Sequence, residues 1–283
     1  MPIDLTDKPI AITGASSGIG RATAIACAAA GMPVALGARR VDKLDAVKVE
    51  IESAGGRAIT VPMDVAHKPD STTLVDRTNE AFGPIYAVFA NAGFGFEARS
   101  DRVPEDRLRE IFEVNFFGSL HTVHAALPTM LEHSRGHAII CSSCIGKLPV
   151  PYFGAYCATK AAQWHMASAL RWELRSKGIF ASSVHPVGTK TEFFDRARER
   201  SKPPPEAGST IDDHTPSWLM QRPETVAHAI VGCLRRPRGE VWPSWARAVQ
   251  LGMAISQAVP SLPGFFFRAG MVKKQEAREK GAH

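Results

Sequence analysis

The stretch Ile10-Ala11-Ile12-Thr13-Gly14-Ala15-Ser16-Ser17-Gly18-Ile19-Gly20 joins a short apolar run to a segment of helical period. Glycine permits a tight turn and a close backbone approach, and a helix N-terminus offers unpaired N–H groups to an anion. The G-x-x-x-G-x-G spacing differs from both the G-x-G-x-x-G pattern and the P-loop. The turn is predicted to hold a phosphate through Gly14, Ser16, Ser17, Gly18, Ile19 and Gly20. The alternative is a tight connection that holds no ligand.

Short apolar runs alternate with stretches of helical period along most of the chain. The runs expected as strands cover residues 10–13, 34–36, 58–61, 85–90, 137–141 and 179–184, with a last one at 239–242. The helices expected between them cover residues 18–30, 41–54, 71–82, 104–131 and 154–177. This alternation predicts an α/β fold, a Rossmann-like doubly wound parallel sheet of about seven strands with helices on both faces. Such sheets bind ligands at the carboxyl ends of their strands.

Composition limits the class of protein. The 283 residues are 45% hydrophobic and 22% charged, which suits one globular domain with extensions and excludes a disordered or collagen-like chain. No run approaches about 18 consecutive apolar residues. The start, MPIDLTDKPIAITG, lacks the basic end of a signal peptide, and the five cysteines favour reduced thiols. These features predict a cytoplasmic protein without a membrane span.

The net charge of +6 arises near the C-terminus. Residues 231–283 contain nine lysines and arginines against three glutamates, so the rest of the chain is neutral. A neutral main domain argues against nucleic acid as a partner.

The end of the second expected strand bears on which dinucleotide the turn would hold. An NAD site has an acidic residue about 20 residues beyond the turn, where it binds the ribose 2′-hydroxyl. This chain instead reads Gly37-Ala38-Arg39-Arg40, with no acid until Asp42. Arginine pairs with a 2′-phosphate, which a carboxylate would repel. The sequence therefore favours NADP(H), bound by Arg39 and Arg40; the alternative is that both arginines are solvated surface charges.

Tyr156 and Lys160 stand four residues apart in an expected helix, so that both side chains lie on one face. A tyrosine pKa of about 10 is too high for a base at neutral pH, and a neighbouring ammonium is expected to lower it. Ser142-Ser143 directly follows one expected strand, and Asn91-Ala92-Gly93 follows another. The carboxyl ends of these strands are where the sheet would present groups to a ligand.

These residues together resemble the short-chain dehydrogenase/reductase family. The resemblance runs from about residue 10 to residue 191, roughly two-thirds of the chain. It includes the TGxxxGIG turn, Asp64 after the third strand, the Asn-Ala-Gly segment, Asn115, and Ser143 thirteen residues before Tyr156. Each motif is common by itself, but their ordered combination is specific.

The resemblance implies an enzyme that transfers a hydride, with a role for each matching residue. Tyr156 would exchange the proton, Ser143 would bind the substrate oxygen, and Lys160 would lower the tyrosine pKa and bind the nicotinamide ribose. Asn115 would help to hold a water that relays protons to Lys160. Asp64 would meet the adenine, and Ser16 with Arg39 the 2′-phosphate. The remaining expected cofactor contacts are Val65, Asn91, Ala92, Gly93, Pro186, Gly188, Thr189 and Thr191.

One segment departs from the family pattern. The family usually has Pro-Gly after the sixth strand, whereas this chain reads His185-Pro186-Val187-Gly188. The glycine therefore comes one residue late, which leaves open the backbone path beside the nicotinamide.

Apolar and aromatic residues surround the expected mouth of the site. Those expected to contact substrate beside Ser143 are Phe94, Phe96, Ile145, Tyr152, Phe153 and Phe193. Loops at strand ends are usually polar, so this surface predicts a bulky apolar carbonyl or alcohol as the small-molecule substrate. The alternative is that a lid packs on these loops without substrate.

We expect residues 1–243 to form the catalytic domain and residues 244–283 a helical extension with a basic tail. A lid is expected over residues 192–222, which include the Pro-rich KPPPEAG. The tail, with Phe265-Phe266-Phe267 before its lysines, admits three readings: a subunit interface, a cover over the site, or weak peripheral contact with an anionic membrane. The resemblance implies a homodimer or homotetramer paired through the two long helices.

Several weaker signals are set aside. Cys141 and Cys144 match C-x-x-C but follow a strand rather than opening a helix, so redox chemistry is not expected. His121 and His124 have no evident third ligand, and we expect no metal. Two rival functions stay open: a catalytically silent NADP(H)-binding sensor or scaffold, and a family member that catalyses epimerisation or dehydration.

Overall fold

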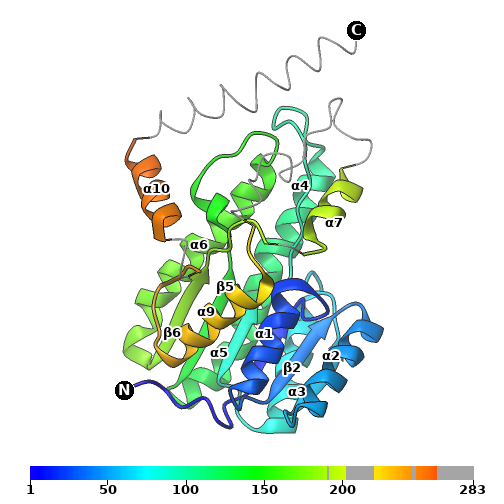
Figure 1. The fold of residues 1–283 in the computed structure, drawn as a ribbon, viewed down its shortest axis with the longest axis vertical. Coiled ribbons are helices and arrows are strands. Elements are labelled where there is room, and N and C mark those ends of the chain that lie inside the picture. The colour runs from blue at the N-terminus through cyan, green and yellow to red at the C-terminus, as the bar shows by residue number, and fades with distance from the viewer. Residues whose placement is uncertain (190, 202–219, 244–246, 260–283) are drawn as a thin grey trace.

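The central element of the fold is a parallel sheet of seven strands (Figure 1). The structure is a computed structural model, which describes residues 1–189, 191–201, 220–243 and 247–259. The strand order is β3-β2-β1-β4-β5-β6-β7, which confirms the predicted doubly wound α/β fold. The strands are β1 Ile10–Thr13, β2 Val34–Ala38, β3 Ala58–Pro62, β4 Ala87–Ala90, β5 Gly136–Cys141, β6 Ile179–Val184 and β7 Glu240–Val241. The order reverses between β1 and β4, where such sheets bind ligands.

Two layers of helices cover the sheet. One face carries α1 Gly18–Ala29, α2 Val41–Ser53 and α9 Pro223–Arg235, and in Figure 1 α1 and α9 lie side by side. The other face carries α3 Lys68–Phe82, α5 Gly118–Glu132 and α6 Gly154–Leu174. Both faces of the sheet are therefore buried, which explains why the central strands are continuous apolar runs without alternation.

The helix expected over residues 104–131 is interrupted. It consists of α4 Glu105–Phe112, a π-helical turn Glu113–Phe117, and α5. A π-helical turn widens the helix by one residue, and such turns often occur at functional sites. The buried residue of this turn is Asn115.

Beyond the carboxyl ends of the strands lie α4, α7 Phe193–Arg200 and α10 Arg247–Ala258 (Figure 1). Most of the expected lid, residues 202–219, and the tail with its phenylalanines, residues 260–283, lie outside the described residues. None of the helices in the described ranges is long and apolar enough to cross a membrane.

Two buried histidines predict how stability responds to acid. Burial lowers the pKa of His137 to about 3 and that of His185 to about 4, from an ordinary 6.5. Below pH 6.5 the unfolded chain therefore binds protons that these two histidines do not bind in the folded protein. Each histidine lowers the free energy of unfolding by about 1.4 kcal/mol for every pH unit between 6.5 and its pKa in the folded protein. We expect His137→Leu to flatten this loss, as measured by urea unfolding at pH 7, 5.5 and 4.5. His124→Leu, the same change at an exposed histidine, is the matched control for the loss of an imidazole.

Candidate active site

The glycine-rich turn after β1 is tied to the end of β4. Asn91 Nδ2 donates to the Thr13 carbonyl at 3.0 Å, and Thr13 Oγ1 accepts from the backbone N–H groups of Asn91 and Ala92. Gly14 has a φ of +67°, a left-handed conformation that favours glycine. A Cβ on Gly20 would overlap the Gly14 carbonyl oxygen, so the turn closes only with glycine there.

A cavity of about 560 Å³ opens at this edge of the sheet. Nearly all of the expected cofactor residues line it: Gly14, Ser16, Ser17, Gly18, Ile19, Arg39, Arg40, Asp64, Val65, Asn91, Ala92, Gly93, Tyr156, Lys160, Pro186, Gly188, Thr189 and Thr191. Gly20 lies behind the turn, where it makes room for Gly14. The sequence-predicted set is thus brought together from segments far apart in the chain.

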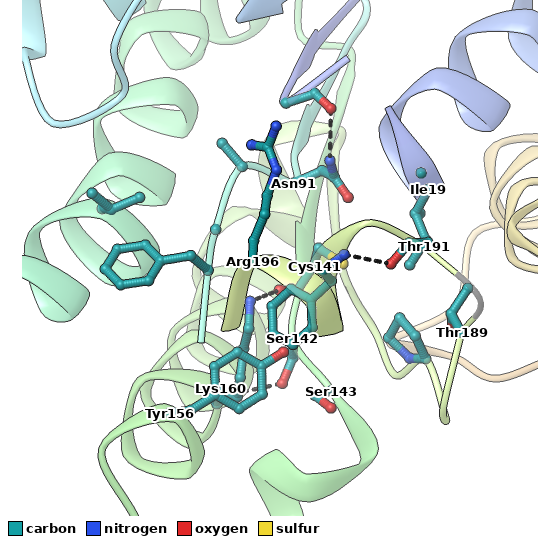
Figure 2. A pocket seen from close by; sticks show the side chains of 18 of the residues that line it. Ile19, Asn91, Cys141, Ser142, Ser143, Tyr156, Lys160, Thr189, Thr191 and Arg196 are labelled. Atoms are coloured by element: carbon teal, nitrogen blue, oxygen red, sulfur yellow. Dashed lines mark hydrogen bonds between the residues drawn. The ribbon is translucent and has the colours of Figure 1, made fainter. Parts of the chain in front are cut away.

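Tyr156, Lys160 and Ser143 meet at the inner wall of this cavity (Figure 2). Tyr156 and Lys160 come from α6, and Ser143 follows β5 immediately before a 3₁₀ turn, Cys144–Lys147. All three side chains are buried. The expected i, i+4 pairing is therefore present beside the hydroxyl of Ser143.

The pKa of Tyr156 is shifted in the direction opposite to the expectation. Burial raises it well above its usual range, the neighbouring cysteine thiols raise it further, and the hydrogen bond with Ser143 opposes this only weakly. Lys160 Nζ lies 5.5 Å from the centre of the tyrosine ring and donates elsewhere, to the Cys141 carbonyl at 2.7 Å and to Gln163 Oε1 at 2.8 Å. Burial also lowers the pKa of Lys160 to about 8. In this state of the protein Tyr156 is a protonated acid at neutral pH.

Asn115 lies behind the cavity wall rather than in it, and its side chain is fully buried. Its Oδ1 accepts from Phe94 N at 2.9 Å, and its Nδ2 donates to the Phe94 carbonyl and to Thr159 Oγ1. These bonds fix the loop after β4 against α6. The side chain of Asn115 therefore shapes the site through its neighbours.

Arg40 rather than Arg39 is the arginine that reaches the glycine-rich turn. Its Nη2 donates to Ser17 Oγ at 2.8 Å and Ser16 Oγ at 3.0 Å, and its Nη1 donates to Glu192 at 2.9 Å. Lys43 also donates to Glu192, at 2.7 Å, and these cations hold the pKa of the Glu192 carboxyl at about 2. Arg39 is more exposed and faces Asp64 at 3.7 Å. The structure thus shows Arg40 bonded to Ser16 and Ser17, while contact of Ser16 and Arg39 with a 2′-phosphate stays a prediction.

The other end of the cavity is apolar. Phe94, Ile145 and Phe193 line it as expected, and the Phe193 ring lies 5.4 Å from that of Tyr156. Phe96, Tyr152 and Phe153 do not line it; they pack behind its wall in a cluster with Val150 and Ile111. These three residues therefore belong to the packing of the loops and not to the cavity surface.

The segment after β6 is held by backbone and side-chain bonds. The Gly188 carbonyl accepts from Gln221 N at 2.7 Å, and Thr189 Oγ1 donates to the Val187 carbonyl at 2.8 Å. Thr191 lies against Gly18, at the mouth of the phosphate end. The late glycine thus leaves Pro186, Gly188, Thr189 and Thr191 on the cavity wall.

Some cavity residues were not predicted. Arg196 points in from α7 (Figure 2), and Val249 and Met253 reach it from α10. Glu192 stands at the phosphate end, and Gln163 contacts Lys160 from behind. Two sequence signals bear on these residues: Gln163 stands three residues after Lys160 on the same helix, and Val249 and Met253 lie in the extension that was expected to be helical.

The signals set aside earlier have structural explanations. Cys141 and Cys144 are free and buried, and burial raises the pKa of both thiols, that of Cys144 to about 11. His121 Nδ1 bonds the Val65 carbonyl at 3.1 Å. Within the described ranges no three His, Cys, Asp or Glu side chains cluster as metal ligands would.

Comparisons with known proteins agree with this geometry. Residues 8–202 match the family model described as short chain dehydrogenase. The chain belongs to this family. An uncharacterized oxidoreductase of Listeria innocua is 34% identical to this short-chain dehydrogenase over 198 residues, which are 69% of this chain and 80% of that protein.

Two solved structures extend the likeness. A short-chain dehydrogenase/reductase of Burkholderia phymatum in complex with NAD has a TM-score of 0.80 and 26% identity, covering 92% of this chain and 96% of that one. An alcohol dehydrogenase of Thermococcus sibiricus complexed with 5-hydroxy-NADP has a TM-score of 0.71 and 29% identity, covering 85% and 98%. This short-chain dehydrogenase is thus similar to oxidoreductases that hold nicotinamide dinucleotides.

Proposed function

We propose that this short-chain dehydrogenase transfers a hydride between NADP(H) and the carbonyl or secondary alcohol of a bulky apolar molecule. The observation that carries the proposal is the meeting of Tyr156, Ser143 and Lys160 on the wall of the cavity that also contains the glycine-rich turn. A silent sensor or scaffold would need the turn but no proton donor.

The residues that line the cavity support binding of a dinucleotide. A Cβ at Gly14 or Gly20 would collide with Asn91 Nδ2, so glycine at both positions lets the turn pack closely against the end of β4. The turn and the N-terminus of α1 would bind the pyrophosphate, Asp64 and Val65 the adenine, and Lys160 the nicotinamide ribose. Bound there, the nicotinamide would supply or accept the hydride.

The residues of this chain would handle the proton. Tyr156 would donate its hydroxyl proton to the substrate oxygen as negative charge develops, and the Ser143 hydroxyl would hydrogen-bond the same oxygen. Because burial raises the tyrosine pKa, the proton is present at neutral pH, which suits reduction of a carbonyl. Oxidation of an alcohol would require the phenolate and therefore a higher pH.

The phosphate end supports a preference for NADP(H) over NAD(H). Arg40 and Lys43 stand beside the Ser16 and Ser17 hydroxyls, and only Glu192 opposes their charge within the contacts described above. A 2′-phosphate could replace the Glu192 carboxylate on these cations and retain charge-assisted hydrogen bonds. The cofactors named in the related structures include both NAD and 5-hydroxy-NADP, so the preference rests on these side chains.

Replacing Arg40 tests the cofactor preference. We expect NADPH to bind the wild-type protein at least about tenfold more tightly than NADH. Arg40→Ala should weaken NADPH about tenfold to hundredfold and leave NADH nearly unchanged, because a hydrogen bond to a charged group is worth about 1.5–3 kcal/mol. Arg39→Ala should have a smaller effect, since Arg39 is 61% exposed.

The measurement is titration of reduced-nicotinamide fluorescence. Arg57→Ala, which removes one positive charge paired with Asp7 near the N-terminus, is the matched control and should change neither constant. A wild-type protein that binds NADH as tightly as NADPH would show that the NADP(H) proposal is wrong.

The remaining proposals concern the outer parts of the chain. We infer that residues 1–243 form the catalytic domain with a lid over about residues 192–222, and that residues 244–283 form an extension whose α10 completes the cavity wall through Val249 and Met253.

Exposed apolar residues on α5, α6 and the π-helical turn, among them Leu131, Trp172 and Phe117, support pairing of subunits through these helices. The composition of the basic tail supports weak peripheral contact with an anionic membrane.

The function is tested by a panel of lipophilic ketones and secondary alcohols. NADPH oxidation is followed by absorbance with each ketone, and NADP⁺ reduction with each alcohol at higher pH. Net turnover of nicotinamide separates the proposal from both rivals, because an epimerase or dehydratase regenerates its cofactor and a sensor leaves it unchanged. Tight NADPH binding without turnover on any substrate would favour the sensor.

A further inference from the structure

A buried glutamine stands between Lys160 and the π-helical turn. Gln163 is 1% exposed, and its Oε1 accepts from Lys160 Nζ at 2.8 Å. Its Nε2 donates to the Asn115 carbonyl and to Ser119 Oγ, both at 2.6 Å. The orientation of the amide is fixed chemically, because the ammonium can only donate and the backbone carbonyl can only accept.

The family resemblance implies a proton-relaying water held by Asn115 beside Lys160, and the Gln163 amide is hydrogen-bonded to both of these residues. The Asn115 carbonyl oxygen accepts from Gln163 Nε2 and also from Ser119 Oγ, at 2.7 Å. A carbonyl oxygen has two lone pairs, so these two donors saturate it. The side chain of Asn115 is likewise engaged with Phe94 and Thr159. The Gln163 amide thus joins Asn115 to Lys160 by hydrogen bonds from a fixed side chain instead of through an exchangeable water.

The surroundings of Lys160 are neutral. Its ammonium donates to two uncharged oxygens, the Cys141 carbonyl and Gln163 Oε1. The titratable groups that face it are Tyr156 from α6 and the Cys141 thiol from β5, and burial raises the pKa of both, which keeps them uncharged at neutral pH. The π-helical turn contributes Asn115 and α5 contributes Ser119, and both are joined to Lys160 through Gln163 of α6. None of these three residues carries a charge. Because no carboxylate among the described residues faces Lys160, its charged form is stabilised by the Cys141 and Gln163 oxygens, and a change at either oxygen should shift the lysine pKa.

We propose that Gln163 is the positioning residue for Lys160, holding its ammonium toward the cofactor cleft and closing its inner side to water. This inference rests on the proposed function, since Lys160 acts there on the nicotinamide ribose. Lys160 would then exchange protons through the cleft, past Tyr156, instead of through the interior. Gln163 contacts neither substrate nor cofactor and acts through Lys160.

Two substitutions should move the titration of Lys160 in opposite directions. Gln163→Met keeps the volume but removes the acceptor, so the charged lysine is less stable and its pKa should fall by about one unit. Gln163→Glu places a carboxylate against the ammonium and should raise the pKa by a similar amount. The alkaline limb of kcat/KM for carbonyl reduction, expected near pH 8 in the wild type, should follow each shift. KM for NADPH should rise and kcat fall in Gln163→Met, about tenfold in kcat/KM at neutral pH.

The lysine is observed directly by NMR of protein labelled with [ε-¹³C]lysine, with the Lys160 signal assigned by its loss in Lys160→Arg. Thr78→Val in α3, which removes a buried hydroxyl bonded to the Leu74 carbonyl, is the control; it should lower the melting temperature without moving the lysine titration. If either glutamine variant fails to fold, the other still carries the measurement.

Each outcome separates the two proposals. Shifted Lys160 titrations together with nicotinamide turnover support both. Shifted titrations without turnover on any panel substrate support the role of Gln163 and oppose the proposed function. Turnover with a Lys160 titration that neither variant moves would overturn the positioning role and leave the proposed function intact.

Discussion

Replacing Tyr156 by phenylalanine is expected to reduce turnover about 10³-fold or more, while the affinity for NADPH stays within about twofold of the wild type. General acid catalysis by one side chain accelerates a reaction about 10²–10⁴-fold, and the Tyr156 hydroxyl would also orient the substrate oxygen. The phenylalanine ring keeps the packing against Phe193. What is lost is the hydroxyl beside Ser143, which is the proposed proton donor. Binding is measured by nicotinamide fluorescence and turnover by absorbance with the best substrate of the panel.

Tyr86→Phe is the matched control for this experiment. Tyr86 is also buried, its hydroxyl has no hydrogen-bond partner among the described residues, and it lies outside the cavity. Loss of the Tyr86 hydroxyl should leave turnover unchanged. Equal losses of turnover and NADPH affinity in Tyr156→Phe would refute the assignment of Tyr156, since a proton donor is not needed for cofactor binding.

Replacing Gly20 by alanine is expected to abolish nucleotide binding. A Cβ at this position would overlap the Gly14 carbonyl oxygen and approach Asn91 Nδ2 to 2.7 Å. Both neighbours belong to the bonds that join the ends of β1 and β4, so neither can move without opening the turn. We expect at least about a hundredfold loss of NADPH affinity, or about 2.7 kcal/mol, together with a lower melting temperature.

Gly232→Ala provides the comparison within another helix. Within the part of the chain that the structure describes, the new methyl group in α9 would meet only the end of Arg238, at 3.8 Å. Alanine also favours the helix over glycine by about 0.5–1 kcal/mol. This variant should bind NADPH normally and melt at the same or a higher temperature. Normal NADPH binding by Gly20→Ala would mean that the dinucleotide does not use the glycine-rich turn.

The sequence predicted the fold well because its signals are local. A strand buried on both faces must be an apolar run, and a right-handed crossover requires a helix before the next parallel strand, so alternation alone specifies the sheet. The short β7, Glu240–Val241, was found for the same reason. The break in the long helix at Asn115 was not predicted, because no proline or glycine marks residues 113–117 and the cause is tertiary.

Site residues that directly follow a strand could be predicted from the sequence. Side-chain directions and contacts between distant segments could not. The glycine-rich turn, Asn91 and Ser143 occupy strand ends, which meet at one edge in any parallel sheet. Whether Arg39 or its neighbour Arg40 faces the turn depends on the side-chain direction at the end of β2, and Glu192 reaches Arg40 from a segment 152 residues away. The pKa of Tyr156 was predicted in the wrong direction, because the depth of burial is a property of the assembled loops and not of the i, i+4 spacing.

The walls of the cavity differ in origin. Its polar side is built from strand ends that also hold the sheet together, whereas Val249 and Met253 on α10 and Phe193 on α7 come from segments added outside the sheet. Mutations in those outer helices would reshape the space offered to a reactant without moving the residues to which we assign hydride and proton transfer. On the proposed function, the choice of substrate would therefore change through substitutions in α7 and α10 while the polar wall of the cavity stays the same.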